Sequence, residues 1–315
     1  MHNLFEILMN PDFLFSVFRV STPILFAALA SVVAENSGAS NIALEGIMLF
    51  GALFGAIGSG LTGSLWLGLL IAICGGLIIA LLLGYFGLYL KTNIILAGIA
   101  LNMLATGGTV FLMYVILGDK GSTSSIPCLA FPAINLPLIQ DIPVVGAILS
   151  GHNLLTYLAF IMVFVVKYLL YNTQLGMHIR CVGENPEAAR SVGINVLRIK
   201  MISLIISGIL ASLGGAFMSI GYMTGFTRDM VSGRGFIALA AAAMGMLSPV
   251  PTMIASVVFG FADALSNIMA ALDIPDEFVK MIPYLVTVIG LIVFSSIKKS
   301  NENKKRIAAL KAALE

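Results

Sequence analysis

The chain has 315 residues, of which 59% are hydrophobic and only 10% charged, and its mean hydropathy is +1.04. Soluble domains carry about 25% charged residues, so a water-soluble core cannot bury this much apolar surface, and lipid must act as the solvent. The net charge of +2 is uninformative by itself, and no nucleic-acid partner is expected. The three cysteines have no paired spacing that would predict a disulfide or a metal site.

Nine apolar stretches follow one another along the chain, and a helix needs about 20 such residues to cross a bilayer. They predict an all-α, polytopic membrane bundle of about nine spans, with residues 1–315 forming one transmembrane domain. The two short stretches, 20–34 and 233–247, are typical of broken helices that line a cavity; a misplaced boundary is the alternative. The stretches are 20–34, 42–59, 65–90, 93–117, 152–171, 201–223, 233–247, 251–272 and 279–297.

Polar residues inside these stretches are candidates for a transport pathway, because polar groups are costly in lipid unless they serve a function. Each has a structural alternative. Asparagine can join helices through hydrogen bonds, and the two glutamates can cap helix ends or pair with Arg19 or Lys91. The candidates in the first half of the chain are Glu35, Asn41, Glu45 and Asn102.

Glycine is frequent, with 32 residues in the chain. The pairs Gly51-x-x-x-Gly55 and Gly221-x-x-x-Gly225 predict helices that approach one another closely in lipid. Such pairs indicate a tightly packed bundle and carry no information about a substrate.

Residues 118–150 contain four prolines, which forbid a continuous helix. The segment is still apolar, so we expect it to lie at the membrane interface or to fold back onto the bundle. A docking face for a substrate-delivery protein and a packing loop are both compatible with this composition.

Residues 173–200 are too polar to span a membrane, and they contain the signals of a short helix. Asn185 suits the N-cap, Pro186 the first helical position, and Glu187 the first turn, where the helix dipole favours an anion. Gly193 can end the helix in a left-handed conformation. Such an element can dock into a cleft on a soluble partner; an ordinary connecting loop is the alternative.

The second half of the chain adds four pathway candidates. Tyr222 and Phe226 lie near the outer end of an apolar stretch and offer aromatic surfaces. Asp263 and Asn267 are four residues apart, so they share one face of a helix. Because an unpaired Asp is expensive in lipid, Asp263 is expected to face a cavity, to pair with a neighbour or to be protonated.

Basic residues predict the orientation, because cytoplasmic loops are rich in Lys and Arg. Ten of the 17 basic residues lie in 173–200 and in the tail 298–315, and we assign both segments to the cytoplasm. Five stretches precede residue 173, so the N-terminus is expected outside, the C-terminus inside, and 118–150 outside the cytoplasm. No cleavable signal is expected at the N-terminus, and Arg19 falls outside, against the rule.

The run from Gly183 to Asn195, GENPEAARSVGIN, resembles the coupling segment of ABC importer permeases that serve ribose-type sugars, branched-chain amino acids and nucleosides. Residues 176–180, GMHIR, also resemble the family pattern, with Cys181 where relatives commonly have Ala. Near the front, residues 35–46 are similar to a segment typical of the nucleoside and simple-sugar branch, and residues 233–240 resemble the family's segment before its third-last span. The resemblance covers nearly the whole chain.

This resemblance implies a non-catalytic permease subunit of a bacterial inner-membrane importer. A second homologous permease would complete the path, two ATP-binding cassettes would dock on the coupling segments, and an extracytoplasmic binding lipoprotein would deliver substrate. Nucleosides are the favoured substrate class, followed by simple sugars and then branched-chain amino acids. No cofactor is expected. The residues implied in coupling are Gly183, Glu184, Asn185, Pro186, Glu187, Ala188, Ala189, Arg190 and Gly193.

ATP hydrolysis is expected in the cassette subunits, because the chain has no Gly-x-x-x-x-Gly-Lys-Ser/Thr phosphate loop. A membrane enzyme would need a clustered catalytic set within the spans, and the sequence offers none. The three histidines, His2, His152 and His178, are too far apart to form a metal pattern. A channel or secondary carrier would work alone and would not need the helix within 183–195.

Overall fold

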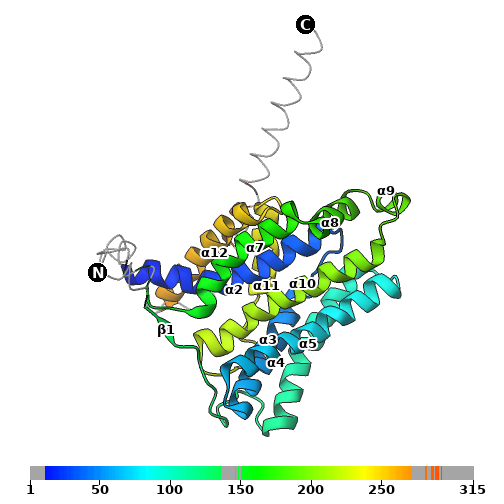
Figure 1. Ribbon diagram of the computed structural model, residues 1–315. Helices are drawn as coiled ribbons and strands as arrows, with labels where there is room; N and C mark the ends of the chain where they lie inside the picture. The colour runs from blue at the N-terminus through cyan, green and yellow to red at the C-terminus, as the bar shows by residue number, and fades with distance from the viewer. Residues whose placement is uncertain are drawn as a thin grey trace.

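The computed structural model describes residues 11–135, 146, 148, 150–270, 281, 285–286, 288–290 and 292. This part of the chain is a bundle of helices (Figure 1). A two-residue strand, β1 (Ala133–Ile134), pairs antiparallel with β2 (His152–Asn153). The helices are α2 (Pro11–Asn36), α3 (Leu44–Thr62), α4 (Leu65–Gly84), η1 (Tyr85–Tyr89), α5 (Ile94–Leu117), α7 (Leu154–Asn172), α8 (Gln174–Glu184), α9 (Pro186–Ser191), α10 (Val196–Ala216), η2 (Phe217–Tyr222), α11 (Arg234–Met244) and α12 (Pro249–Ala270).

Seven helices of the described chain are long and apolar enough to cross a membrane. They correspond to seven of the nine predicted stretches, and the π-helical turns η1 and η2 prolong α4 and α10 to Tyr89 and Tyr222. The stretch 279–297 lies mostly outside the described residues. The seven helices are Pro11–Asn36, Leu44–Thr62, Leu65–Tyr89, Ile94–Leu117, Leu154–Asn172, Val196–Tyr222 and Pro249–Met269.

For the first short stretch, 20–34, the structure shows the alternative, a misplaced boundary, and not a broken helix. Helix α2 has 26 residues and begins at Pro11, so it is a full-length helix with Pro23 inside it. The predicted stretch began too late because the charge of Arg19 interrupts the apolar run, and this residue lies within α2 rather than before it. The second short stretch is short in the structure as well, since α11 has 11 residues.

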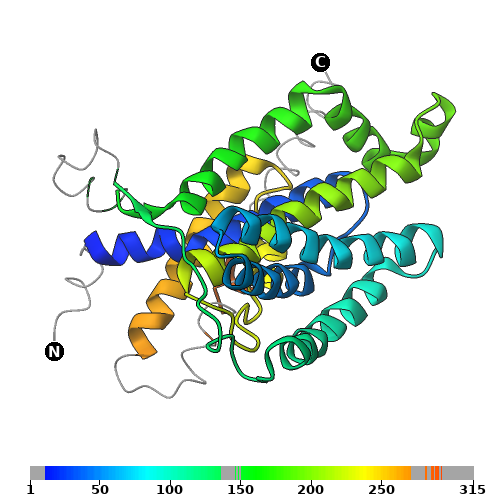
Figure 2. The ribbon, with the colours of Figure 1, turned by 60° about the horizontal axis from the view of Figure 1, so that its bottom comes forward.

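The core of the bundle is formed by α2, α3 and α10, around which the other helices pack (Figure 2). The most apolar window of α2 is 89% buried, whereas that of α5 is 28% buried. The outer side of α5 carries large exposed apolar side chains, among them Met103, Phe111 and Val115. In a membrane such a surface faces lipid or another apolar helix.

Glycines bring α3 and α10 into close contact. A Cβ atom on Gly51 would lie 2.8 Å from the backbone oxygen of Ser212, and one on Gly55 would lie 3.2 Å from the Ser219 hydroxyl. The predicted role of Gly51-x-x-x-Gly55 is therefore confirmed. That of Gly221-x-x-x-Gly225 is wrong, because Gly225 lies beyond η2 in a loop, at φ +140°.

Contacts between distant segments define two opposite ends of the molecule. At the α9 end, Asn36 Nδ2 donates to the Leu247 carbonyl (2.9 Å), and Lys200 Nζ donates to the Gly38 carbonyl (3.2 Å). The β1 end lies opposite (Figure 1). There, the backbone of Thr123 and Phe131 is hydrogen-bonded to Phe226 and Ile220 respectively.

These contacts at the β1 end show that residues 118–135 fold back onto the bundle, as one of the predicted arrangements required. The Cys128 thiol also contacts the Ala56 carbonyl (3.6 Å) on α3. Most of residues 136–149 lie outside the described part of the chain.

Candidate functional site

The short helix predicted within 173–200 is present as α9, with both expected end signals. The Asn185 Oδ1 atom accepts hydrogen bonds from the backbone N–H groups of Glu187 and Ala188, each at 3.0 Å. Pro186 occupies the first turn. Gly193 adopts φ +86°, and its N–H donates to the Arg190 carbonyl at 3.0 Å. Local chemistry thus specifies both ends of this helix.

Helix α9 projects from the bundle (Figure 1), and most of its side chains are exposed. Ala189 alone is buried, at 4% exposed, and anchors the helix. A cavity of about 400 Å³ lies between α9 and α10, lined by Arg190, Gly193 and residues 194–197. The exposed residues of the predicted coupling segment are Glu184, Asn185, Pro186, Glu187, Ala188, Arg190 and Gly193.

Gly183 joins this projecting unit to the core. Its Cα atom packs so closely against the backbone carbonyl of Asn36 that a side chain would collide with it. Gly38, which follows the end of α2, also contacts Gly183. A movement of α8 and α9 would therefore press directly on the end of α2, the helix at the centre of the bundle.

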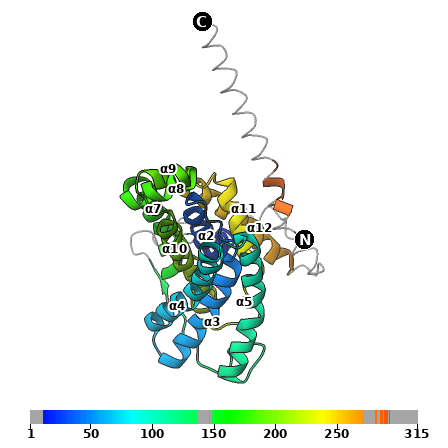
Figure 3. The same cartoon turned by 90° about the vertical axis from the view of Figure 1, so that its right-hand side faces the viewer.

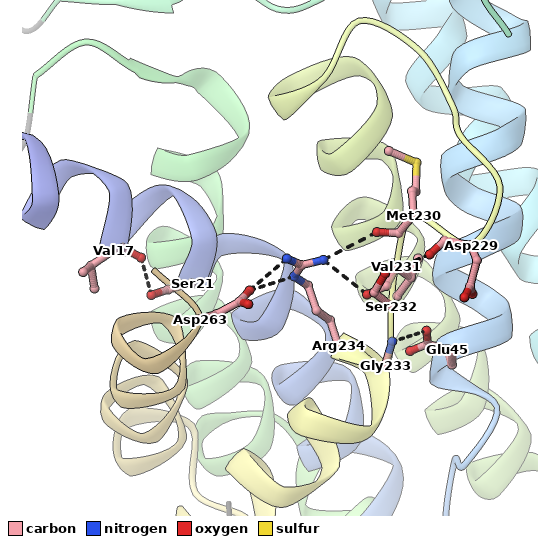
Figure 4. Close-up of polar contacts among 10 residues, drawn as sticks. All are labelled: Val17, Ser21, Glu45, Asp229, Met230, Val231, Ser232, Gly233, Arg234 and Asp263. Carbon is pink, nitrogen blue, oxygen red and sulfur yellow. Dashed lines mark hydrogen bonds and ion pairs between the residues drawn. The ribbon is translucent and has the colours of Figure 1, made fainter. Parts of the chain in front are cut away.

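The start of α11 is held by a carboxylate from another helix. Glu45, at the start of α3, is 6% exposed. Its Oε1 accepts from the Gly233 N–H at 2.8 Å (Figure 4). Its Oε2 accepts from the Gly235 N–H at 2.7 Å. The first N–H groups of a helix have no partner within that helix, so Glu45 caps α11 from outside.

Arg234 and Asp263 fasten the same helix to α12. The Nε and Nη2 atoms of Arg234 lie 3.0 and 2.9 Å from Asp263 Oδ2 (Figure 4). The Nη1 atom donates to the Met230 and Val231 carbonyls, at 3.5 and 3.3 Å. Asp263 was expected to face a cavity, to pair with a neighbour or to be protonated, and the structure shows that it pairs with Arg234.

Two asparagines that were candidates for the pathway, Asn102 and Asn41, instead join neighbouring segments through hydrogen bonds, which was the structural alternative. Asn102 joins α5 to the start of α3, since its Oδ1 accepts from the Gly46 N–H and its Nδ2 donates to the Ile42 carbonyl, each at 2.8 Å. Asn41 is fully buried, and its Nδ2 donates to the Ser207 hydroxyl at 2.8 Å.

The remaining pathway candidates, Tyr222, Phe226 and Asn267, do not line a common pocket among the described residues. Phe226 is 1% exposed, so it offers no open surface to a substrate. Tyr222 is 42% exposed, and the guanidinium of Arg19 lies over its ring at 4.9 Å. Asn267 is exposed on α12, although Asp263 one turn earlier is buried.

Two arginines near the β1 end, Arg19 and Arg234, were not predicted as site residues. Both line a small pocket with Tyr222, and Arg19 Nε is buried without a hydrogen-bond partner among the described residues. Their charge within apolar surroundings was the signal that could have identified them. The pocket holds about 20 Å³, which is room for about one water molecule.

A much larger cavity, of about 710 Å³, lies at the α9 end between the end of α2, the turn before α3, and α11. Glu35 is the pathway candidate that reaches it. The other lining residues are Ser31, Ser40, Ile42, Leu239, Ala243, Met246 and Leu247. Among the described residues, no group of three His, Cys, Asp or Glu side chains is placed to hold a metal ion.

Comparison with known proteins identifies the family. The family model described as "Branched-chain amino acid transport system / permease component" matches residues 13–291. The guanosine ABC transporter permease protein NupQ of Bacillus subtilis is 36% identical over 285 residues, which cover 87% of this chain and 89% of that protein.

Two further relatives carry related names. The nucleoside ABC transporter permease protein NupC of Lactococcus lactis is 33% identical over 87% of this chain and 89% of its own length. The putative glucose ABC transporter permease protein TsgC13 of Haloferax volcanii is 32% identical over 78% of this chain and 74% of its own length. With its apolar bundle and its family match over most of its length, this chain belongs to the branched-chain amino acid transport system family of integral membrane permease components.

Proposed function

We propose that the chain is the permease subunit of an ATP-driven importer that carries nucleosides across a bacterial inner membrane. The observation that carries this proposal is the capped, projecting helix α9, in a chain whose relatives are named as guanosine and nucleoside ABC transporter permeases. Simple sugars are the second candidate class, favoured by the relative that is named as a glucose permease.

The coupling step would begin at α9. Helices α8 and α9 lie together at one extremity of the molecule (Figure 3). An ATP-binding cassette that docks on the face formed by Glu187 and Arg190 would move α8, and Gly183 would transmit this movement to Asn36 and α2. ATP would be hydrolysed in the cassette, and this chain would contribute no catalytic group.

The α9 end would face the cytoplasm and the β1 end the outside, with the N-terminus outside and the C-terminus inside. The basic residues of 173–200 support this orientation. A second homologous permease would complete the path, and a binding lipoprotein would deliver substrate at the β1 end. The folded-back loop 118–135 provides an ordered surface there.

Uptake of radiolabelled guanosine by cells that express the complete transporter tests the proposal. The substitution Arg190→Ala on α9 is expected to reduce uptake at least about fivefold and to separate ATP hydrolysis from transport, because it removes a central docking charge. Arg198→Ala, an exposed arginine at the start of α10, is the matched control. Guanosine uptake that persists without the cassette subunit would contradict the proposal.

A further inference from the structure

The cavity of about 710 Å³ at the α9 end has the size of a small-molecule site, since such sites measure about 300–1,000 Å³. Its apolar lining comes from Ile42, Leu239, Met246 and Leu247, and its polar lining from Ser31, Glu35 and Ser40. No positively charged side chain lines it among the described residues. An apolar wall with a few polar groups suits a neutral ligand that has one flat apolar part and one hydroxylated part.

Glu35 has a carboxylate oxygen that is available to accept a hydrogen bond from a ligand in this cavity. Glu35 Oε2 accepts a hydrogen bond from the Ser40 hydroxyl at 3.1 Å, whereas Oε1 accepts none from the described residues. The cavity thus presents a carboxylate with one oxygen available, and a carboxylate only accepts hydrogen bonds.

A carboxylate facing a cavity is suited to ribose, because its two oxygens accept hydrogen bonds from sugar hydroxyls, as acidic residues do in dinucleotide sites. An anionic ligand would be repelled by Glu35. We propose that this cavity is an inner binding site of the transport path, in which Glu35 accepts a hydrogen bond from the ribose 2′-hydroxyl of a nucleoside and the apolar wall covers its base. This inference rests on the proposed function and deepens it.

The position of the cavity links ligand release to coupling. Asn36 follows Glu35 directly, and its side chain donates to the carbonyl of Leu247, which lines the cavity. The backbone carbonyl of the same Asn36 packs against Gly183 at the end of α8. A displacement of α8 would therefore shift both Glu35 and Leu247 and would change the shape of the site when the cassettes move.

The test compares uptake of uridine and 2′-deoxyuridine by the complete transporter, carrying either the native chain or a variant. Glu35→Ala is expected to reduce uridine uptake about tenfold and 2′-deoxyuridine uptake less than about threefold, since one hydrogen bond to a charged group is lost only with the former. Glu35→Gln, which keeps one acceptor oxygen, is expected to be intermediate. Because the same binding protein delivers both substrates, the ratio between variant and native chain isolates the contribution of the permease.

Leu239→Ala is the matched control, because it alters the apolar wall and should reduce uptake of both nucleosides equally. The amount of transporter in the membrane is measured for each variant. Equal loss of both substrates in Glu35→Ala, or no loss of either, would overturn the inner ribose site while leaving the importer intact. Failure of the native complex to import any nucleoside would instead overturn the proposed function.

Discussion

Glu45 illustrates how one side chain stabilises a distant element. Its carboxylate lies at the start of α3, yet it accepts hydrogen bonds from the N–H groups of Gly233 and Gly235, almost 200 positions later in the chain. Helix α11 has no side-chain cap of its own at Gly233. Glu45 therefore satisfies donors that would otherwise be buried without partners, which is costly in a bilayer.

The substitution Glu45→Ala should lower the free energy of unfolding by about 2–4 kcal/mol, because one buried and one partly buried N–H group lose their acceptor. Glu45→Gln retains one acceptor oxygen and should lose less. The measurement is thermal unfolding of the purified protein in detergent, with the exposed Glu184→Ala as the control. Unchanged stability of Glu45→Ala would mean that water reaches and satisfies the start of α11.

His152 lies just before α7 and is 3% exposed, stacked on Phe15 with ring centroids 4.0 Å apart. Burial lowers the pKa of His152 below its usual value, and its Nε2 lies 2.9 Å from the Ile148 carbonyl. The unfolded chain takes up this proton at about pH 6.5, whereas the folded protein does so only at a lower pH. Its contribution to stability is therefore present above pH 6.5 and is lost as the pH falls towards the folded pKa.

We expect the melting temperature to fall between pH 7.5 and pH 5.5, and to fall less in His152→Gln. The experiment is a series of thermal unfolding curves in detergent at constant ionic strength. An identical pH dependence in the native protein and in the variant would exclude His152 as the titrating group.

At the scale of the elements, helix α11 is held near both of its ends by contacts with other helices. It follows a loop that runs inward from the β1 end, and it ends at the α9 end, where Asn36 bonds to Leu247. Its start is held by Glu45 and by the ion pair between Arg234 and Asp263. Because α11 also lines the large cavity, these contacts determine the position of one of its walls.

The crossing of α3 and α10 depends on the absence of a side chain at Gly51. We expect Gly51→Val to reduce the folded, membrane-inserted protein severely, since its Cβ would meet the backbone of Ser212 at 2.8 Å and backbone cannot move aside as a side chain does. The yield of monodisperse protein in detergent is the measurement. Gly107→Val, on α5, is the control, because nothing lies within 4 Å of a Cβ atom there. Equal yields for the two variants would contradict this account.

At the scale of the whole molecule, the two ends form independent sets of contacts that agree with the charge distribution. Lys200, Gly38 and Gly183 meet at the α9 end. The loop 118–135 meets residues 220–227 at the β1 end. Residues 173–200 and residues 118–135 therefore lie at opposite ends of the described fold, as the proposed orientation requires.

Cysteine labelling in intact cells measures this orientation. In a variant without the three natural cysteines, Ser124→Cys at the β1 end should react with a membrane-impermeant maleimide, whereas Val192→Cys beside α9 should react only after the membrane is opened. Both native side chains are exposed, so accessibility within the fold does not distinguish them. Labelling of Val192→Cys in intact cells would reverse the proposed orientation.

The sequence alone determined those features whose causes are local. Apolar stretches long enough to span a bilayer predicted six of the seven long helices closely, and the seventh was misjudged at its start because Arg19 interrupts the apolar run. The caps of α9 were readable because Asn185, Pro186 and Gly193 act on neighbouring backbone groups.

The tertiary structure decided which polar residues join helices and which face open space. The sequence does not distinguish the polar candidates from one another. In the structure, each of four has a hydrogen-bond or ion-pair partner that no spacing rule identifies: Asn41, Glu45, Asn102 and Asp263. Only Glu35 among the candidates reaches the large cavity. The reason is physical: a buried hydrogen bond depends on where two distant helices meet, and that is determined by the packing of the entire bundle.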